Sequence, residues 1–146
     1  IEVPEKASQT FKEGDLVSLD TAGRVQVVAT GDVLVFGIAR EDASGTTDTL
    51  ISVAKIEMDT QFAVCVTHDT PASAITAIID LVTPYGVTRS TRKWYVNKSD
   101  TTTDFWIPQE LAARNFNKGK EAVGDQYGQL ICKIKPACIQ HSGVVS

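Results

Sequence analysis

The sequence has few of the residues on which active sites and metal sites usually depend. Its 146 residues include two histidines, three cysteines and one methionine. No two cysteines stand at the C-x₂₋₄-C spacing of structural zinc sites, and no G-x-S-x-G nucleophile elbow is present. The chain also has no P-loop and no G-x-G-x-x-G segment. These absences predict a protein that is not an enzyme and that holds no cofactor and no metal.

Concentrated charge and long apolar runs are missing as well. The net charge is −4, and the longest basic cluster is Arg92-Lys93. Nucleic-acid binding needs a concentrated basic face, so this scatter argues against it. No apolar run reaches the roughly 18–20 residues of a membrane span, and no signal-peptide pattern is visible. We therefore expect neither nucleic acid nor membrane as a partner.

β-branched residues dominate the apolar part of the sequence. Valine, isoleucine and threonine together number 43, whereas leucine numbers 7. Such side chains suit a pleated sheet and lose rotamer freedom in a helix. A chain of this length typically forms one domain. The composition therefore predicts a mainly β fold, a compact antiparallel β-barrel or β-sandwich-like single domain with one or two short helices.

The three cysteines do not indicate a disulfide framework, because their number is odd. Cys65 and Cys132 fall inside strand patterns, where a thiol packs as a small apolar group. A bridge between Cys132 and Cys138 is the alternative, and it would need a local bend. Plain packing in a reducing place of assembly fits better.

The first half of the chain contains three alternating apolar segments separated by turns. They cover residues 15–20, 24–30 and 34–40, and Gly and Asp punctuate the connections. This pattern predicts an antiparallel meander. Gly37 lies opposite the apolar face of the third segment, where we expect a close neighbour or a bulge.

Further strands are predicted along the rest of the chain. Residues 50–57 and 61–68 are expected to pair, and the second of these is apolar on both faces, which is typical of a central strand. The aromatic triplets at 94–96 and 105–107 indicate a hairpin with a polar tip. Residues 130–135 are expected to form the last strand.

Two segments have helical signals. Residues 69–83 carry apolar side chains at i, i+3, i+4 and i+7, which predicts an amphipathic helix; these are Ile75, Ile78, Ile79 and Val82. Isoleucine and threonine are mediocre helix formers, so a strand stays an alternative there. Residues 108–115 are expected to form one or two helical turns, because Pro108 suits a first helical position.

The two ends differ from the predicted β-rich domain, which covers residues 11–140. Residues 1–10 have no periodicity and indicate an extended N-terminal arm. It is either a frayed terminus or a strap that docks on a neighbouring subunit through Ile1, Val3 and Pro4. Residues 141–146 form a short polar tail.

Two groups of side chains could carry chemistry or binding. His68, Asp69 and Ser73 are close in sequence, but they lack the motif that a hydrolase triad requires, so surface positions are expected. Trp94 and Trp106 could stack on sugar rings or on bases, although tryptophan more often anchors a core or an interface.

Several segments resemble one protein family. The stretch EGDLVSLDTAGRVQVV…VFGIAREDASG is similar to the opening of the capsid decoration, or cement, proteins of tailed bacteriophages. VCVTHDTPASAI at 64–75, KWYVNKSDTT at 93–102 and the segment 123–140 support the same resemblance. Residues 86–93 and 109–120 do not share it.

The resemblance implies a structural virion protein made in the host cytoplasm and bound to the outer surface of an assembled capsid. Its partner would be the major capsid protein lattice, which it would clamp and stabilise as a homotrimer. The candidate partner contacts are Ile1, Val3, Pro4, Trp94 and Trp106. The alternative is a carbohydrate- or receptor-binding β module, which predicts that Trp94, Tyr95 and Trp106 are exposed in a row.

Overall fold

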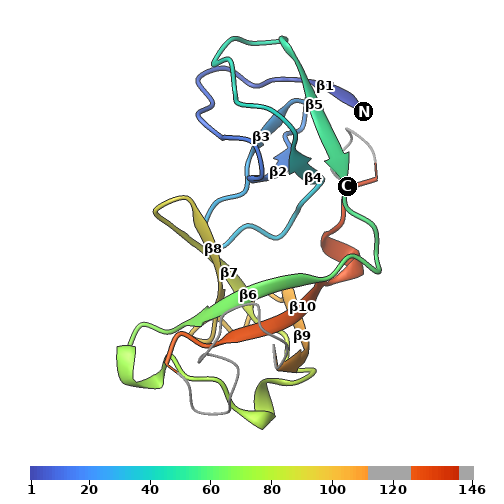
Figure 1. The fold of residues 1–146 in the computed structure, drawn as a ribbon. Helices are drawn as coiled ribbons and strands as arrows, with labels where there is room; N and C mark the ends of the chain where they lie inside the picture. Colours follow the sequence, from blue (N-terminus) through green and yellow to red (C-terminus); the bar gives the residue numbers. More distant parts are fainter. Residues whose placement is uncertain (112–125, 142–146) are drawn as a thin grey trace. The chain divides into compact units, whose positions relative to one another are not determined.

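The computed structural model describes residues 1–111 and 126–141 (Figure 1). In these residues, ten strands form two five-stranded sheets, so the predicted mainly β fold is confirmed. Three short 3₁₀-helices, and no α-helix, occur in these two ranges; they are η1 (Pro71–Ser73), η2 (Ile78–Asp80) and η3 (Pro136–Cys138). The chain divides into two compact units, one for each sheet. The sequence predicted one β-rich domain over residues 11–140 and did not indicate this division into two units.

Unit 1 comprises Ile1–Val28, Leu34–Glu57 and Pro136–Ser146. Its sheet has the order β1-β5-β4-β2-β3 and is antiparallel throughout. The strands are β1 (Glu2–Pro4), β2 (Leu16–Leu19), β3 (Val25–Val27), β4 (Gly37–Ala39) and β5 (Leu50–Lys55).

The three strands predicted between residues 15 and 40 are present, but the meander order is wrong. β2 pairs with both β3 and β4, so it lies between them. Every residue of β2 is buried, which suits a strand flanked on both sides. The second predicted strand instead lies at the edge of the sheet.

The expected close neighbour of Gly37 is confirmed. Gly37 pairs with Lys55 of β5, and a Cβ atom added to it would collide with the Ala54 carbonyl oxygen and with Val53 Cγ1. Glycine therefore allows β4 and β5 to approach each other.

The N-terminal segment is part of unit 1 rather than an extended arm. Glu2–Pro4 forms β1, which pairs with β5, and the Val3 side chain joins the core cluster of the unit. The fully buried Glu5 carboxylate accepts hydrogen bonds from the Ser44 amide at 2.9 Å and the Gly45 amide at 2.7 Å. The pairing of β1 with β5, the packing of Val3 in the core and the hydrogen bonds to Glu5 hold the segment in place.

Unit 2 comprises Ala29–Val33 and Met58–Lys135. Its sheet has the order β7-β8-β6-β10-β9, in which only β6 and β8 pair in parallel. The strands are β6 (Phe62–Thr67), β7 (Gly86–Ser90), β8 (Lys93–Asn97), β9 (Trp106–Leu111) and β10 (Gln129–Ile134). The central position expected for residues 61–68 and the last strand expected at 130–135 are both confirmed.

Two predicted pairings are wrong. β5 and β6 belong to different sheets, and β8 does not pair with β9. The tight hairpin is β7–β8, whose two connecting residues, Thr91 and Arg92, have φ angles of 49° and 61°. Positive φ at both positions matches the twist of a two-residue hairpin. This turn is hard to predict from the sequence, because neither residue is Gly, Asn or Asp.

The helical predictions are also wrong where the structure describes them. Residues 69–83 contain only the two short 3₁₀-helices η1 and η2. Residues 108–111 continue β9, with Pro108 on an edge strand, where its missing N–H is tolerated. Residues 112–115, and most of the predicted loop and tail at 117–126 and 141–146, lie outside the described residues.

The three cysteines are buried thiols outside any disulfide, so the interpretation as plain packing is confirmed. Burial raises the pKa of the Cys132 thiol, which keeps it protonated. Trp106 forms the centre of the unit 2 core, with edge contacts to Phe62 and Phe105.

Candidate functional site

The most unusual surface feature of unit 2 is a segment that exposes large apolar side chains. We call residues 75–82 the apolar loop. Ile78, Ile79 and Val82 expose 65%, 76% and 75% of their surface, and Ile75 is also exposed. Single exposed apolar residues are ordinary, but four within eight residues indicate an interaction site.

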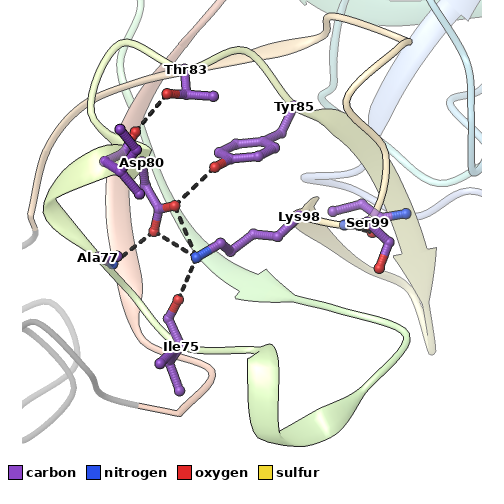
Figure 2. Close-up of polar contacts among 9 residues, drawn as sticks. Ile75, Ala77, Asp80, Thr83, Tyr85, Lys98 and Ser99 are labelled. Carbon is purple, nitrogen blue, oxygen red and sulfur yellow. Dashed lines mark hydrogen bonds and ion pairs between the residues drawn. The ribbon is translucent and has the colours of Figure 1, made fainter.

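A buried carboxylate fixes the backbone of this loop (Figure 2). Asp80 is fully buried, and its two oxygens lie 2.8 Å and 3.0 Å from Lys98 Nζ. The Tyr85 hydroxyl donates to Asp80 Oδ1 at 2.9 Å, and the Ala77 amide donates to Oδ2 at 2.8 Å. Lys98 Nζ also donates to the Ile75 carbonyl at 2.7 Å.

This Asp80 cluster ties the loop to the sheet. The Ala77 amide and the Ile75 carbonyl belong to the loop, whereas Lys98 directly follows β8 and Tyr85 directly precedes β7. A buried charge persists only when it is paired and hydrogen-bonded, and here both conditions hold. Burial, together with Asp80, raises the pKa of the Tyr85 hydroxyl, so it stays a donor at neutral pH. These contacts consequently link the loop to the residues that flank β7 and β8.

Val82 shows that the loop conformation carries strain. Its φ is 61°, which is a sparsely populated region for a β-branched residue. Its amide donates to the Pro108 carbonyl at 2.8 Å, which ties it to β9. Such a conformation costs about 1–3 kcal/mol and persists only when the surroundings impose it. The outward position of the Val82 side chain is therefore enforced by its neighbours.

The sequence did not identify this site correctly. The i, i+3, i+4, i+7 spacing was interpreted as a helix face, and such a face would be buried. The one available signal was the poor helix propensity of isoleucine and threonine. Nothing in the sequence pairs Asp80 with Lys98.

A second feature of unit 2 is a pocket of about 480 Å³ on one face of its sheet. Its lining is rich in hydroxyl groups and contains one amine and one thiol. The lining residues are Cys65 and Thr67 from β6, Thr88 and Ser90 from β7, Lys93 and Tyr95 from β8, and Tyr127.

Two of the five predicted partner contacts are buried. Ile1 is exposed, but Val3 is buried in unit 1 and Trp106 is completely buried in unit 2. Trp94 is half-buried, and the Arg89 guanidinium lies 5.3 Å from its ring centre. The predicted interface roles of Val3 and Trp106 are therefore wrong, because both side chains pack in the cores of their units. The predicted row of exposed aromatics is wrong for the same reason, since Trp106 is buried. Pro4 lies in β1 and is half-buried.

The residues of the hydrolase alternative do not form a triad. His68 Nδ1 accepts a hydrogen bond from the Thr70 amide, and the Asp69 amide donates to Ser99 Oγ. Across residues 1–111 and 126–141, no group of three or more His, Cys, Asp or Glu residues is placed to hold a metal ion. None of the helices in these ranges has the length and apolar character to span a bilayer.

Comparison with known proteins identifies no family and no relative for this chain. No protein-family model matches the chain, and neither the curated proteins nor the solved structures include a match.

Proposed function

We propose that this chain is a structural virion protein that binds the outer surface of an assembled capsid and clamps neighbouring major-capsid subunits. It would be made in the host cytoplasm, act as a homotrimer and catalyse no reaction. The observation that carries the proposal is the fixed and exposed apolar loop. The resemblance of residues 64–75, which lead into this loop, to capsid decoration proteins supports the choice of partner.

The composition of the loop suits a protein partner. Branched aliphatic side chains form no directional polar contacts, and burying one completely contributes about 1.5–3 kcal/mol. Ile78, Ile79 and Val82 are the best placed for this, because each exposes most of its surface. They would fill apolar pockets between capsid subunits, as buried anchors do in other interfaces.

Fixing the loop before binding increases the affinity. Ordering a mobile segment during association costs free energy, and the Asp80 cluster has already met this cost during folding. The strained Val82 supports the same interpretation, since its backbone is tied to β9 whether or not a partner is present.

The free-energy cost of association also explains why we expect a trimer. Association costs an estimated 4–15 kcal/mol, which is comparable to what one apolar loop can supply. Three loops on one trimer would bind with a high effective concentration once the first is engaged. A repeating capsid lattice offers such a set of equivalent sites.

The test is co-sedimentation with assembled shells of the major capsid protein encoded with this chain. The double variant I78S/I79S should bind at least tenfold more weakly than the unchanged chain. The matched control is Leu50→Ser, because Leu50 is also an exposed apolar residue but lies in β5 of unit 1. Binding of I78S/I79S at full affinity would contradict the proposal. A monomer in mass photometry would contradict its trimeric part.

A further inference from the structure

The pocket occupies the polar face of the unit 2 sheet. Thr88 pairs with Tyr95, and Tyr95 pairs with Cys65, so these three side chains form a row across β7, β8 and β6 on one face. Ser90 and Lys93 form the neighbouring pair. The opposite face of the same strands carries completely buried valines, namely Val66, Val87 and Val96. The valines of the opposite face are therefore core residues, whereas on the pocket face Cys65 is buried and Ser90 and Lys93 are exposed.

Lys93 gives the pocket a positive charge, and no carboxylate in the described part of the chain pairs with it. Its Nζ lies 3.6 Å from Cys65 Sγ, a weak acceptor, and 5.3 Å from the centre of the Tyr95 ring. Within the described ranges, Lys93 forms no salt bridge. Among the residues that the structure describes, no Asp or Glu lines the pocket. The ammonium therefore has two N–H groups available for an anionic ligand.

The pocket also contains a buried hydroxyl with no partner. Thr88 Oγ1 is inaccessible to solvent and forms no hydrogen bond. A buried hydroxyl without a partner is unfavourable, and such groups call for an explanation. Thr67 and Ser90 also line the pocket, and their hydroxyl groups are donors and acceptors suited to a ligand rich in hydroxyl groups.

Tyr127 supplies an aromatic surface at the same pocket. It exposes 41% of its surface, and its φ of 51° is uncommon for a residue other than glycine. Its amide donates to the Ala74 carbonyl at 2.6 Å, which holds the strained backbone. An outlier of this kind at a pocket is an indication of function.

We infer that this pocket binds an acidic sugar unit. The Lys93 ammonium would pair with the carboxylate, the hydroxyl side chains would bind the sugar hydroxyls, and the Tyr127 ring would lie against the sugar ring. A volume of about 480 Å³ is within the usual range for small-ligand sites. This function goes beyond capsid binding, because no residue of the apolar loop lines the pocket.

The test is isothermal titration calorimetry of the full chain with the methyl glycosides of glucuronic acid and N-acetylneuraminic acid. Their methyl esters and methyl glucoside serve as uncharged probes. We expect at least one acid to bind and its ester to bind at least tenfold more weakly. Lys93→Gln should weaken binding of the acid at least tenfold. The matched control is Lys55→Gln, because Lys55 Nζ also lies over an aromatic ring, that of Phe36, but in unit 1.

Three results would overturn the inference: binding of none of these sugars, equal binding of acid and ester, or full affinity in Lys93→Gln. The acid–ester comparison needs no variant, so it is independent of any effect on folding. Lys93→Gln should leave capsid co-sedimentation unchanged, and I78S/I79S should leave sugar binding unchanged. Failure of one proposal can therefore be distinguished from failure of the other.

Discussion

Replacing Asp80 by alanine should destabilise the protein strongly, because it leaves a lysine almost buried without its counter-charge. The Lys98 side chain is 13% exposed, and both oxygens of Asp80 contact its Nζ. Removing one partner of such a pair typically costs about 3–5 kcal/mol. Small domains have a total free energy of unfolding of about 5–15 kcal/mol, so Asp80→Ala should remove a large fraction of it.

The magnitude can be measured by urea unfolding of a double-mutant cycle. Asp80→Ala and Lys98→Met should each be strongly destabilising, because each leaves one uncompensated buried charge. The D80A/K98M double variant should lose at least about 1 kcal/mol less than the sum of the single losses, in line with the coupling of residues in direct contact. The matched control is Asp59→Ala. Asp59 is almost fully exposed and lies 3.6 Å from Lys133, so it should change stability by no more than about 1 kcal/mol.

Two results would refute this reasoning. If Asp80→Ala costs no more than Asp59→Ala, the carboxylate does not hold the loop. If the losses in the cycle are additive, Asp80 and Lys98 act independently. In addition, Asp80→Ala should weaken capsid binding at temperatures where the variant is still folded, because its loop would no longer be fixed before binding.

Four other predictions concern single features. Val82→Gly should raise the free energy of unfolding by about 1 kcal/mol in urea titrations, by relieving the strain at φ 61°, yet it should weaken capsid co-sedimentation; a destabilised variant would contradict the strain argument. Folding raises the pKa of Tyr85. Its contribution to the free energy of unfolding is therefore fully present below pH 10, and it falls by about 1.4 kcal/mol per pH unit as the pH rises above 10. Tyr85→Phe should reduce this alkaline slope, and an unchanged slope in pH-dependent unfolding would count against it. Gly37→Ala should cost about 1–3 kcal/mol through overpacking against β5, so an unaltered urea midpoint would argue against a close approach. Deleting residues 1–8 should lower the melting temperature, since it removes β1 and the buried Glu5; calorimetry showing full stability would indicate a dispensable arm.

The sequence by itself determined the fold class and much of the strand placement. The excess of β-branched residues favoured sheet because such side chains suit a pleated surface. Alternation located the strands that became β2, β3 and β4, and the two apolar faces of residues 61–68 identified a central strand. A glycine inside a strand pattern predicted a close neighbour or a bulge at Gly37, and the structure shows the close neighbour.

The tertiary structure alone decided which strands pair and what the apolar loop does. A two-residue period states which side chains share a face, but it carries no information on the neighbouring strand. For that reason the pairing of β2 with β4, the separation of β5 from β6 and the division into two units were all missed. The spacing of Ile75, Ile78, Ile79 and Val82 fits a buried helix face, whereas in the fold these side chains are exposed. Asp80, Tyr85 and Lys98 come together through the sheet, and this long-range contact turns an apolar sequence into a fixed surface.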